Sequence, residues 1–373
     1  MSLRLIGAAL AMPLFLAMGA PATADDVTPG AKPAASTATT PDEPGLKAPK
    51  GWHAKRTEWG DPDISGRWPI DNLSSTPAQR PPNLGAKAWL SDAEYAAATK
   101  AAEEQLKLYN LEVKANRMGM GHWTERGMPI RQTSLIMEPA DGRIPPPTPL
   151  GKELSKNTKS SWTEQTFEWV TDFSPMDRCI TRGLPGSMMP GAYNSGIEVW
   201  QSPGYAVIRI EEIHEARIIP IARGKGPPPA PVKGWMGYSV GHWEGDTLVI
   251  ETTNFVPGQP IGGNGGIGGR PIPNSDQMKV VERLTPTGPD HIHYEAWVTD
   301  PVTLTAPFKY DFPWTRNNNY KQYEYACFEG NEQTRGYIEG TSPFEVAKRE
   351  AREKARAAGT LATTDRNTSS SNR

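Results

Sequence analysis

Cysteine, histidine and net charge are all scarce in this chain, and each scarcity argues against a class of protein. The 373 residues include two cysteines and six histidines, and the formal net charge is −2. Neither a C-x-x-C pair nor a Cys/His zinc spacing occurs, which argues against a thiolate metal site. A charge this close to zero creates no field that attracts nucleic acid, so we expect no nucleic-acid partner.

Motifs for nucleotides and for serine nucleophiles are missing as well. The glycine-rich segment 261–270 lacks the Gly-Lys-Ser/Thr ending of a phosphate-binding loop, and no G-x-S-x-G motif occurs. No β-α-β alternation appears either, which disfavours a parallel nucleotide-binding sheet. We therefore predict no cofactor.

One long apolar segment is present, at the N-terminus. Arg4 precedes the apolar stretch 5–20, and Ala22-Thr23-Ala24 has the small-x-small pattern of a cleavage site. We interpret residues 1–24 as a signal peptide; a retained membrane anchor is the disfavoured alternative, because no stop-transfer pattern follows. No later segment reaches about 18 apolar residues. The mature protein is then expected to be periplasmic or secreted from a bacterium, without stable membrane insertion.

The composition divides the rest of the chain into a core and two polar ends. Residues 25–50 and 360–373 lack apolar periodicity and are predicted to be a disordered linker and a disordered tail. Between them we expect a single domain over 51–340, with a helical N-terminal extension near 88–110 that opens on a Ser-x-x-Glu capping box. A charged helix is predicted over 341–359.

Short strands separated by turn signals make up the centre of the chain. Three segments each contain two β-rich runs around a turn, 196–212, 235–255 and 275–301, and two further candidate strands follow within 304–317 and 320–330. This spacing predicts a mainly β fold, an antiparallel meander that closes into a barrel or a sandwich. The Gly-x-Trp sequence at 66–68 favours a lipocalin-like barrel, with peripheral α-helices near both ends of the chain.

Several blocks of the sequence resemble a large family of exported bacterial proteins that lack an established activity. The blocks are DRCITRGLP (177–185), GYAVIRIEEIHEARIIP (204–220), GHWEGDTLVIETTNF (241–255) and YEYACFEGN (323–331). The resemblance implies kinship and export and names no reaction. This chain has Glu215 where the family pattern has Asp, and Tyr238 and Val240 before His242. If those positions contact a ligand, the ligand preference differs here.

An unusual concentration of charge follows the apolar run that ends at Ile210. If that strand continues, alternate side chains share a face, so Glu212 and His214 follow Ile208 and Ile210 inward as an acid–base pair. The alternative is that the strand ends near Glu211 and His214 belongs to a polar hairpin. The sequence leaves both readings open.

The remaining candidate ligand-binding residues come from four other places. They are Arg182, Arg217, His242, Trp243 and Asn254. Arg217 reaches the inner face only if the chain bends after His214. His242 and Trp243 directly precede the turn of a hairpin, at the expected mouth of the barrel. Asn254 shares the more apolar face of its strand and is predicted to orient a ligand oxygen.

The two cysteines and two nearby arginines form a second group. In an oxidising compartment the simplest pairing is a Cys179–Cys327 disulfide, which would stabilise the fold by about 4–5 kcal/mol in the chain-entropy model. Two buried free thiols are the alternative. Arg178 or Arg182 then lies across an opening and binds an anionic or carbonyl oxygen, or one of them ties its loop to a carboxylate.

His291 and His293 alternate as a metal-ligand pair does, but the sequence offers no obvious third ligand, so no metal site is predicted.

The chemical inventory fits a protein that binds a small organic or carbohydrate-like molecule, with room for a cofactor-independent lyase, dehydratase or isomerase step. A non-catalytic binding or scavenging protein and a structural envelope protein are the alternatives. Whether the protein is an enzyme, and its oligomeric state, are open from the sequence.

Overall fold

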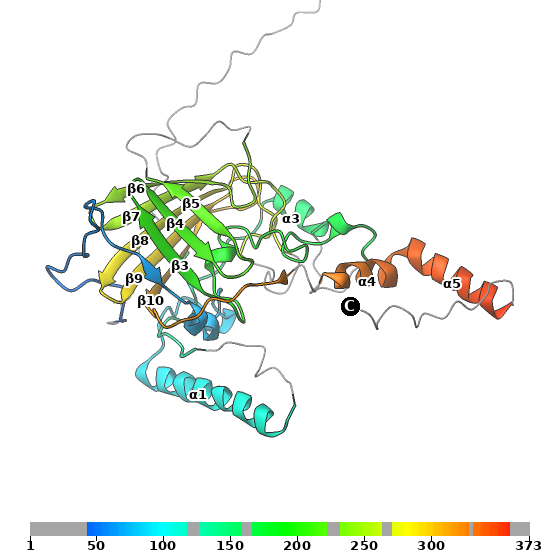
Figure 1. Cartoon of the computed structure of the whole chain (residues 1–373), viewed down its shortest axis with the longest axis horizontal. Helices are drawn as coiled ribbons and strands as arrows, with labels where there is room; N and C mark the ends of the chain where they lie inside the picture. The colour runs from blue at the N-terminus through cyan, green and yellow to red at the C-terminus, as the bar shows by residue number, and fades with distance from the viewer. Residues whose placement is uncertain are drawn as a thin grey trace, which may run out of the picture. The chain divides into compact units, whose positions relative to one another are not determined.

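The computed structural model, drawn in Figure 1, describes residues 43–117, 127–158, 166–221, 232–262, 271–327 and 331–358. The predicted signal peptide, most of the predicted linker and the predicted tail lie outside these residues, as does most of the glycine-rich segment. Of the helices in the described ranges, none is long and apolar enough to cross a membrane.

Two antiparallel sheets contain the strands. The four-stranded sheet has the order β1 (Gly66–Arg67), β3 (Ile197–Ser202), β4 (Tyr205–Ile210) and β5 (Ala216–Pro220). The six-stranded sheet has the order β2 (Ile136–Glu138), β10 (Phe308–Thr315), β9 (His291–Thr299), β8 (Lys279–Gly288), β7 (Thr247–Thr253) and β6 (Tyr238–Glu244). The mainly β, antiparallel prediction is confirmed, and each of the three predicted hairpins is present: β3–β4, β6–β7 and β8–β9.

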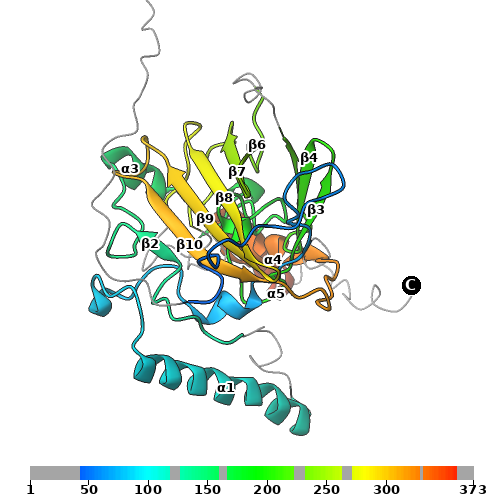
Figure 2. The ribbon, with the colours of Figure 1, turned by 90° about the vertical axis from the view of Figure 1, so that its left-hand side faces the viewer.

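The two sheets face one another across a shared apolar core. Figure 1 shows β3, β4 and β5 in front of β6 to β10, and in Figure 2 β3 and β4 lie to one side of the same strands. Strands of both sheets contribute to one cluster of buried side chains, with Ile208 and Ile219 from one sheet and Leu284 and Tyr294 from the other. The Tyr294 ring stacks on Trp314 at 4.8 Å between centroids. Burial alternates along β4, β8 and β9, as the period of two requires.

Neither sheet closes on itself, although their edges meet. A single bridge joins Ile221, directly after β5, to Gly241 of β6. Near the other edge, Asn317 donates a backbone hydrogen bond to Arg67 of β1 at 2.9 Å. Trp68 of the Gly-x-Trp sequence is buried beside that edge, and the guanidinium of Arg316 lies over its ring at 4.2 Å.

The helices match the prediction at both ends of the chain and differ between them. The helix α1 (Asp92–Lys114) begins at the predicted capping box, and α5 (Pro343–Ala357) begins after Ser342. Short 3-10 turns, η1 to η4, cover Asp71–Ser75, Pro82–Leu84, Val170–Asp172 and Gly186–Met188.

Two helices, α3 (Pro149–Lys156) and α4 (Glu332–Thr341), were not predicted. The start signal of α3 is local, because the Thr148 side chain accepts a hydrogen bond from Gly151 and Pro149 occupies the first turn. The strand predicted within 320–330 is wrong for its described residues. No strand forms over 320–327, and the Tyr320 hydroxyl and the Tyr323 backbone amide donate hydrogen bonds to the carboxylate of Glu211.

Candidate functional site

The charged segment after β4 is a hairpin turn and not a continuation of the strand. β4 ends at Ile210, whose amide pairs with the carbonyl of Glu215 at 2.8 Å, and β5 begins at Ala216. His214 has a left-handed φ of 57°. Its side chain is exposed, and Nδ1 lies 3.0 Å from the carbonyl oxygen of Tyr325. The inward Glu212–His214 pair is therefore wrong, because the turn removes the strand alternation on which it depended.

The three glutamates of this turn are fixed by partners from distant parts of the chain. Glu211 is buried and accepts hydrogen bonds from donors of Asn194, Gly196, Tyr320 and Tyr323. With this many donors, its carboxylate ties the hairpin to two other segments.

Glu212 and Glu215 complete the network. Glu212 is buried and its Oε2 lies 2.9 Å from Nη1 of Arg182. Glu215 accepts from the hydroxyls of Thr181 and Ser187. Burial raises the pKa of both carboxyls, while Arg182 opposes the shift at Glu212 and Thr181 opposes it at Glu215. Arg182 thus ties its loop to a carboxylate, which is the second role considered for it.

Arg217 lies inside the fold, because the turn reverses the alternation and directs Arg217 and Ile219 inward. Its Nη1 donates to Glu282 of β8 at 2.9 Å and its Nη2 contacts the other carboxylate oxygen. Both side chains are almost completely buried. The hydroxyl of Tyr294 also donates to Glu282. This bidentate pair joins β5 of one sheet to β8 of the other. Because both side chains are buried and paired, we assign the pair a structural role.

The other predicted binding residues are spread over separate places. Nε2 of His242 lies 3.3 Å from Glu244 on a half-exposed strand face, and Trp243 packs against the core. Asn254 follows β7 with a φ of 60°. The predicted disulfide between Cys179 and Cys327 is present, with 5.6 Å between the Cα atoms. The structure therefore brings Glu212 and Arg182 together, and it does not gather the predicted set into one site.

A pocket of about 600 Å³ lies elsewhere, near the disulfide, and we call it the Arg178 pocket. Its lining comes from the end of α3, from the segment 171–178 with Arg178, and from the segments 257–260 and 273–276. Trp235 lines it as well. Its volume is typical of sites for small organic molecules.

Arg178 is the distinctive group of this pocket. Its guanidinium lies 5.9 Å from the centre of the Trp235 ring, and its Nε is buried and has no hydrogen-bond partner in the described part of the chain. Among the described residues, no carboxylate lies within ion-pair distance of Arg178, although Arg182 is paired. A cation held beside an aromatic ring and lacking a counter-charge is a binding group for an anionic or carbonyl oxygen.

The walls of the Arg178 pocket are held by buried amide side chains. The side-chain amide of Gln259 donates to the carbonyls of Trp235 and Val256, and the backbone amide of Gln259 donates to Oδ1 of Asn274 at 2.6 Å. Asp300 accepts from both the amide and the hydroxyl of Ser275. These bonds connect Trp235 to the two segments opposite, so the pocket is formed before any ligand enters.

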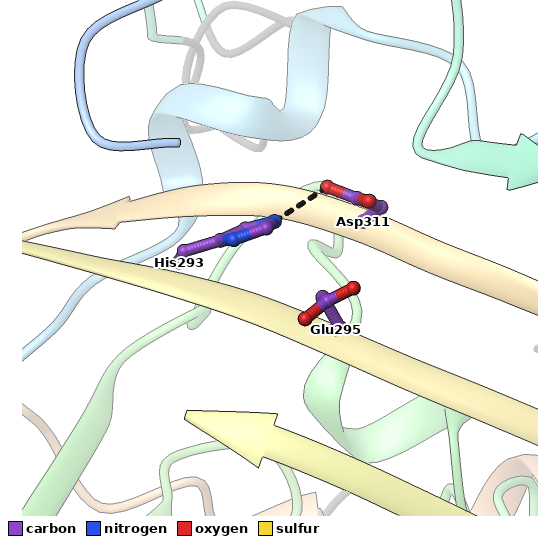
Figure 3. Close-up of side chains that lie close together, drawn as sticks. All are labelled: His293, Glu295 and Asp311. Carbon is purple, nitrogen blue, oxygen red and sulfur yellow. Dashed lines mark hydrogen bonds and ion pairs between the residues drawn. The ribbon is translucent and has the colours of Figure 1, made fainter. Parts of the chain in front are cut away.

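A second polar cluster lies on the outer face of the six-stranded sheet (Figure 3). Nε2 of His293 lies 2.7 Å from Oδ1 of Asp311, and Glu295 lies nearby. The neighbours of His293 in this cluster are therefore two carboxylates, and His291 is not part of it. The ammonium of Lys309 lies 2.9 Å from Asp311 and 3.2 Å from Glu295. Since Lys309 supplies the positive charge that a divalent cation would bring, we interpret the cluster as an ion-pair network.

The sequence does not identify Trp235, Gln259 or Asn274 as site residues. A glycine-rich context surrounds Trp235, and Asn274 lies in a polar Pro-Asn-Ser turn, and neither pattern has a binding signature of its own. Only Arg178 carried a signal, through its position beside Cys179.

The described residues thus define a mainly antiparallel β protein with a preformed pocket. No family model, no curated protein and no solved structure matches the chain. The resemblance to exported bacterial proteins, with the location it implies, remains a prediction from the sequence.

Proposed function

We propose that this is an exported protein that binds a small organic molecule in the Arg178 pocket. The observation that carries the proposal is the guanidinium of Arg178, which no described carboxylate pairs, beside Trp235 in a pocket of about 600 Å³. The prolines and Phe173 of the lining supply apolar surface, and the Gln259 and Asn274 bonds fix its shape. A few polar groups in a largely apolar lining are typical of ligand sites.

The proposal is for binding and does not include an acid–base step. The acid–base hypothesis required Glu212 and His214 to face one cavity, whereas Glu212 is paired with Arg182 and His214 is exposed. Binding by a preformed pocket requires neither residue.

We also propose that the two sheets form a flattened, partly open barrel. The Ile221–Gly241 bridge at one edge and the Asn317–Arg67 hydrogen bond near the other support this arrangement. The burial of Trp68 under Arg316, at one end of the strands, supports it as well.

The test is a thermal-shift screen of the full chain against a panel of small organic molecules, with calorimetry for every molecule that raises Tm. A ligand at 100 times its Kd stabilises the folded state by about 2.7 kcal/mol, which a melting curve resolves. Trp235→Ala removes the aromatic wall and is expected to abolish the shift. Trp200→Ala is the matched control, because Trp200 is an exposed tryptophan of β3 outside the pocket.

The proposal requires that binding respond to the first variant and not to the second. Equal affinity of the wild type and Trp235→Ala for every ligand found would contradict it. So would a panel in which no molecule shifts the melting curve of the wild type.

A further inference from the structure

We propose that the ligand of the Arg178 pocket is an organic monoanion, a carboxylate on an apolar or aromatic body, and that Arg178 binds the carboxylate. This inference rests on the proposed function and specifies the ligand class.

In the part of the lining that the structure describes, the charged groups are Arg178, Asp172 and Asp276. The carboxylate of Asp172 accepts hydrogen bonds from the amides of Glu168 and Trp169, at 2.8 and 3.3 Å. Asp276 is paired with Lys233 at 2.9 Å. Both acids of the lining are therefore engaged in contacts of their own.

The acid adjacent to Arg178 along the chain, Asp177, also accepts hydrogen bonds of its own. Asp177 directs Oδ2 to the amide and the hydroxyl of Ser174, at 3.1 and 2.8 Å. Within the described ranges, Arg178 is therefore left as the lining cation that no acidic side chain neutralises. A partly buried charge without a counter-charge is costly, and an anion that enters the pocket offsets that cost.

The geometry favours a carboxylate. A planar guanidinium presents parallel N–H groups that match the two oxygens of a carboxylate, and its pairs are stronger than neutral hydrogen bonds. With one unneutralised cation in the described lining, a single negative charge is compensated, whereas the second charge of a phosphate dianion is not. A monoanion is therefore preferred over a dianion.

The rest of the pocket favours an apolar body. The lining includes Trp235, Phe173 and the prolines at 257, 260 and 273, and the Trp235 ring lies beside Arg178. A flat ring that packs against these side chains loses little conformational entropy on binding, and the pocket volume admits a fused ring system.

The experiment compares matched ligands that differ only in charge, in calorimetric titrations of the full chain. The series contains aryl carboxylates of increasing size, from phenylacetate to naphthalene-2-carboxylate, each with its primary amide and with the corresponding aryl phosphate. The variant is Arg178→Gln, which removes the charge and keeps a polar side chain. Arg352→Gln on α5 is the control, since Arg352 is exposed and is not among the lining residues.

The expected result is that the carboxylates bind the wild type at least about tenfold more tightly than their amides and than the phosphates. Arg178→Gln is expected to remove that preference and leave the affinity for the amides unchanged, while Arg352→Gln changes neither. Melting curves of the variants verify that each is folded.

Two results overturn the inference in different ways. Amides that bind as tightly as carboxylates, with no effect of Arg178→Gln, overturn the ligand class and leave the proposed function standing. A series in which no member binds overturns the ligand class, and it overturns the proposed function as well only if the thermal-shift panel also contains no molecule that raises Tm. Preference for the phosphates shows that the site accepts a dianion and also overturns the monoanion assignment.

Discussion

The buried Arg217–Glu282 pair provides a quantitative test of how the two sheets are held together. Glu282 accepts both guanidinium contacts from Arg217 and a further hydrogen bond from Tyr294. The two side chains are 2% and 0% exposed, so removing one partner leaves a charge in the core. Breaking such a pair costs about 3–5 kcal/mol, a large part of the stability of a typical domain.

The perturbation is a double-mutant cycle of Arg217→Met and Glu282→Gln, followed by urea unfolding at neutral pH. Each single variant is expected to lose about 3–5 kcal/mol, and the double variant less than their sum by about 1–3 kcal/mol, because no unpaired charge remains. Glu251→Gln is the control, since the Lys279–Glu251 pair is nearly half exposed on both sides and contributes less than about 1 kcal/mol. Single variants no more costly than this control, or losses that simply add, would refute the assignment of the pair as a joint between the sheets.

Three further predictions concern other parts of the chain. Replacing Cys179 and Cys327 by serine opens a loop with a sequence separation of 148 and is expected to cost up to about 4–5 kcal/mol in urea unfolding; an unchanged midpoint contradicts this. Burial opposes the charge of His293, but Asp311 outweighs it and raises the His293 pKa, so the pair stabilises fully below the unfolded-state pKa of about 6.5 and progressively less as the pH rises through the folded value. The loss in His293→Gln should therefore shrink between pH 5 and pH 9, and a loss independent of pH refutes the linkage. His214→Ala removes one exposed hydrogen bond, so it should lower the free energy of unfolding by less than about 1 kcal/mol and leave ligand affinity unchanged. Weaker ligand binding on calorimetric titration would show that His214 contributes to the binding site.

The hairpins of both sheets were predictable because their signals are local. The turns at 203–204, 245–246 and 289–290 contain glycine, aspartate or proline between runs of alternating apolar residues, and this pattern determines both the strand positions and the inward faces. Burial of Thr252, on the more apolar face of its strand, follows from the same alternation.

The end of β4 was not predictable from the same pattern. The turn after Ile210 is fixed by long-range bonds from Tyr320 and Tyr323 to Glu211 and by Arg182 to Glu212. A sequence of alternating charges is compatible with both a strand and a turn, so the tertiary partners decide. The Arg178 pocket was not predictable for the same reason. Its lining residues are far apart in the sequence, and only the tertiary fold brings Trp235 and the segment 273–276 into one pocket with Arg178.

The position of a bound ligand tests the central claim most directly. A crystal structure with a bromine-substituted aryl carboxylate, located by the anomalous signal of bromine, identifies the site independently of any variant. The bromine is expected within the Arg178 pocket, with the carboxylate on the guanidinium of Arg178 and the ring against Trp235. A ligand bound elsewhere on the protein, with the Arg178 pocket empty, would contradict it.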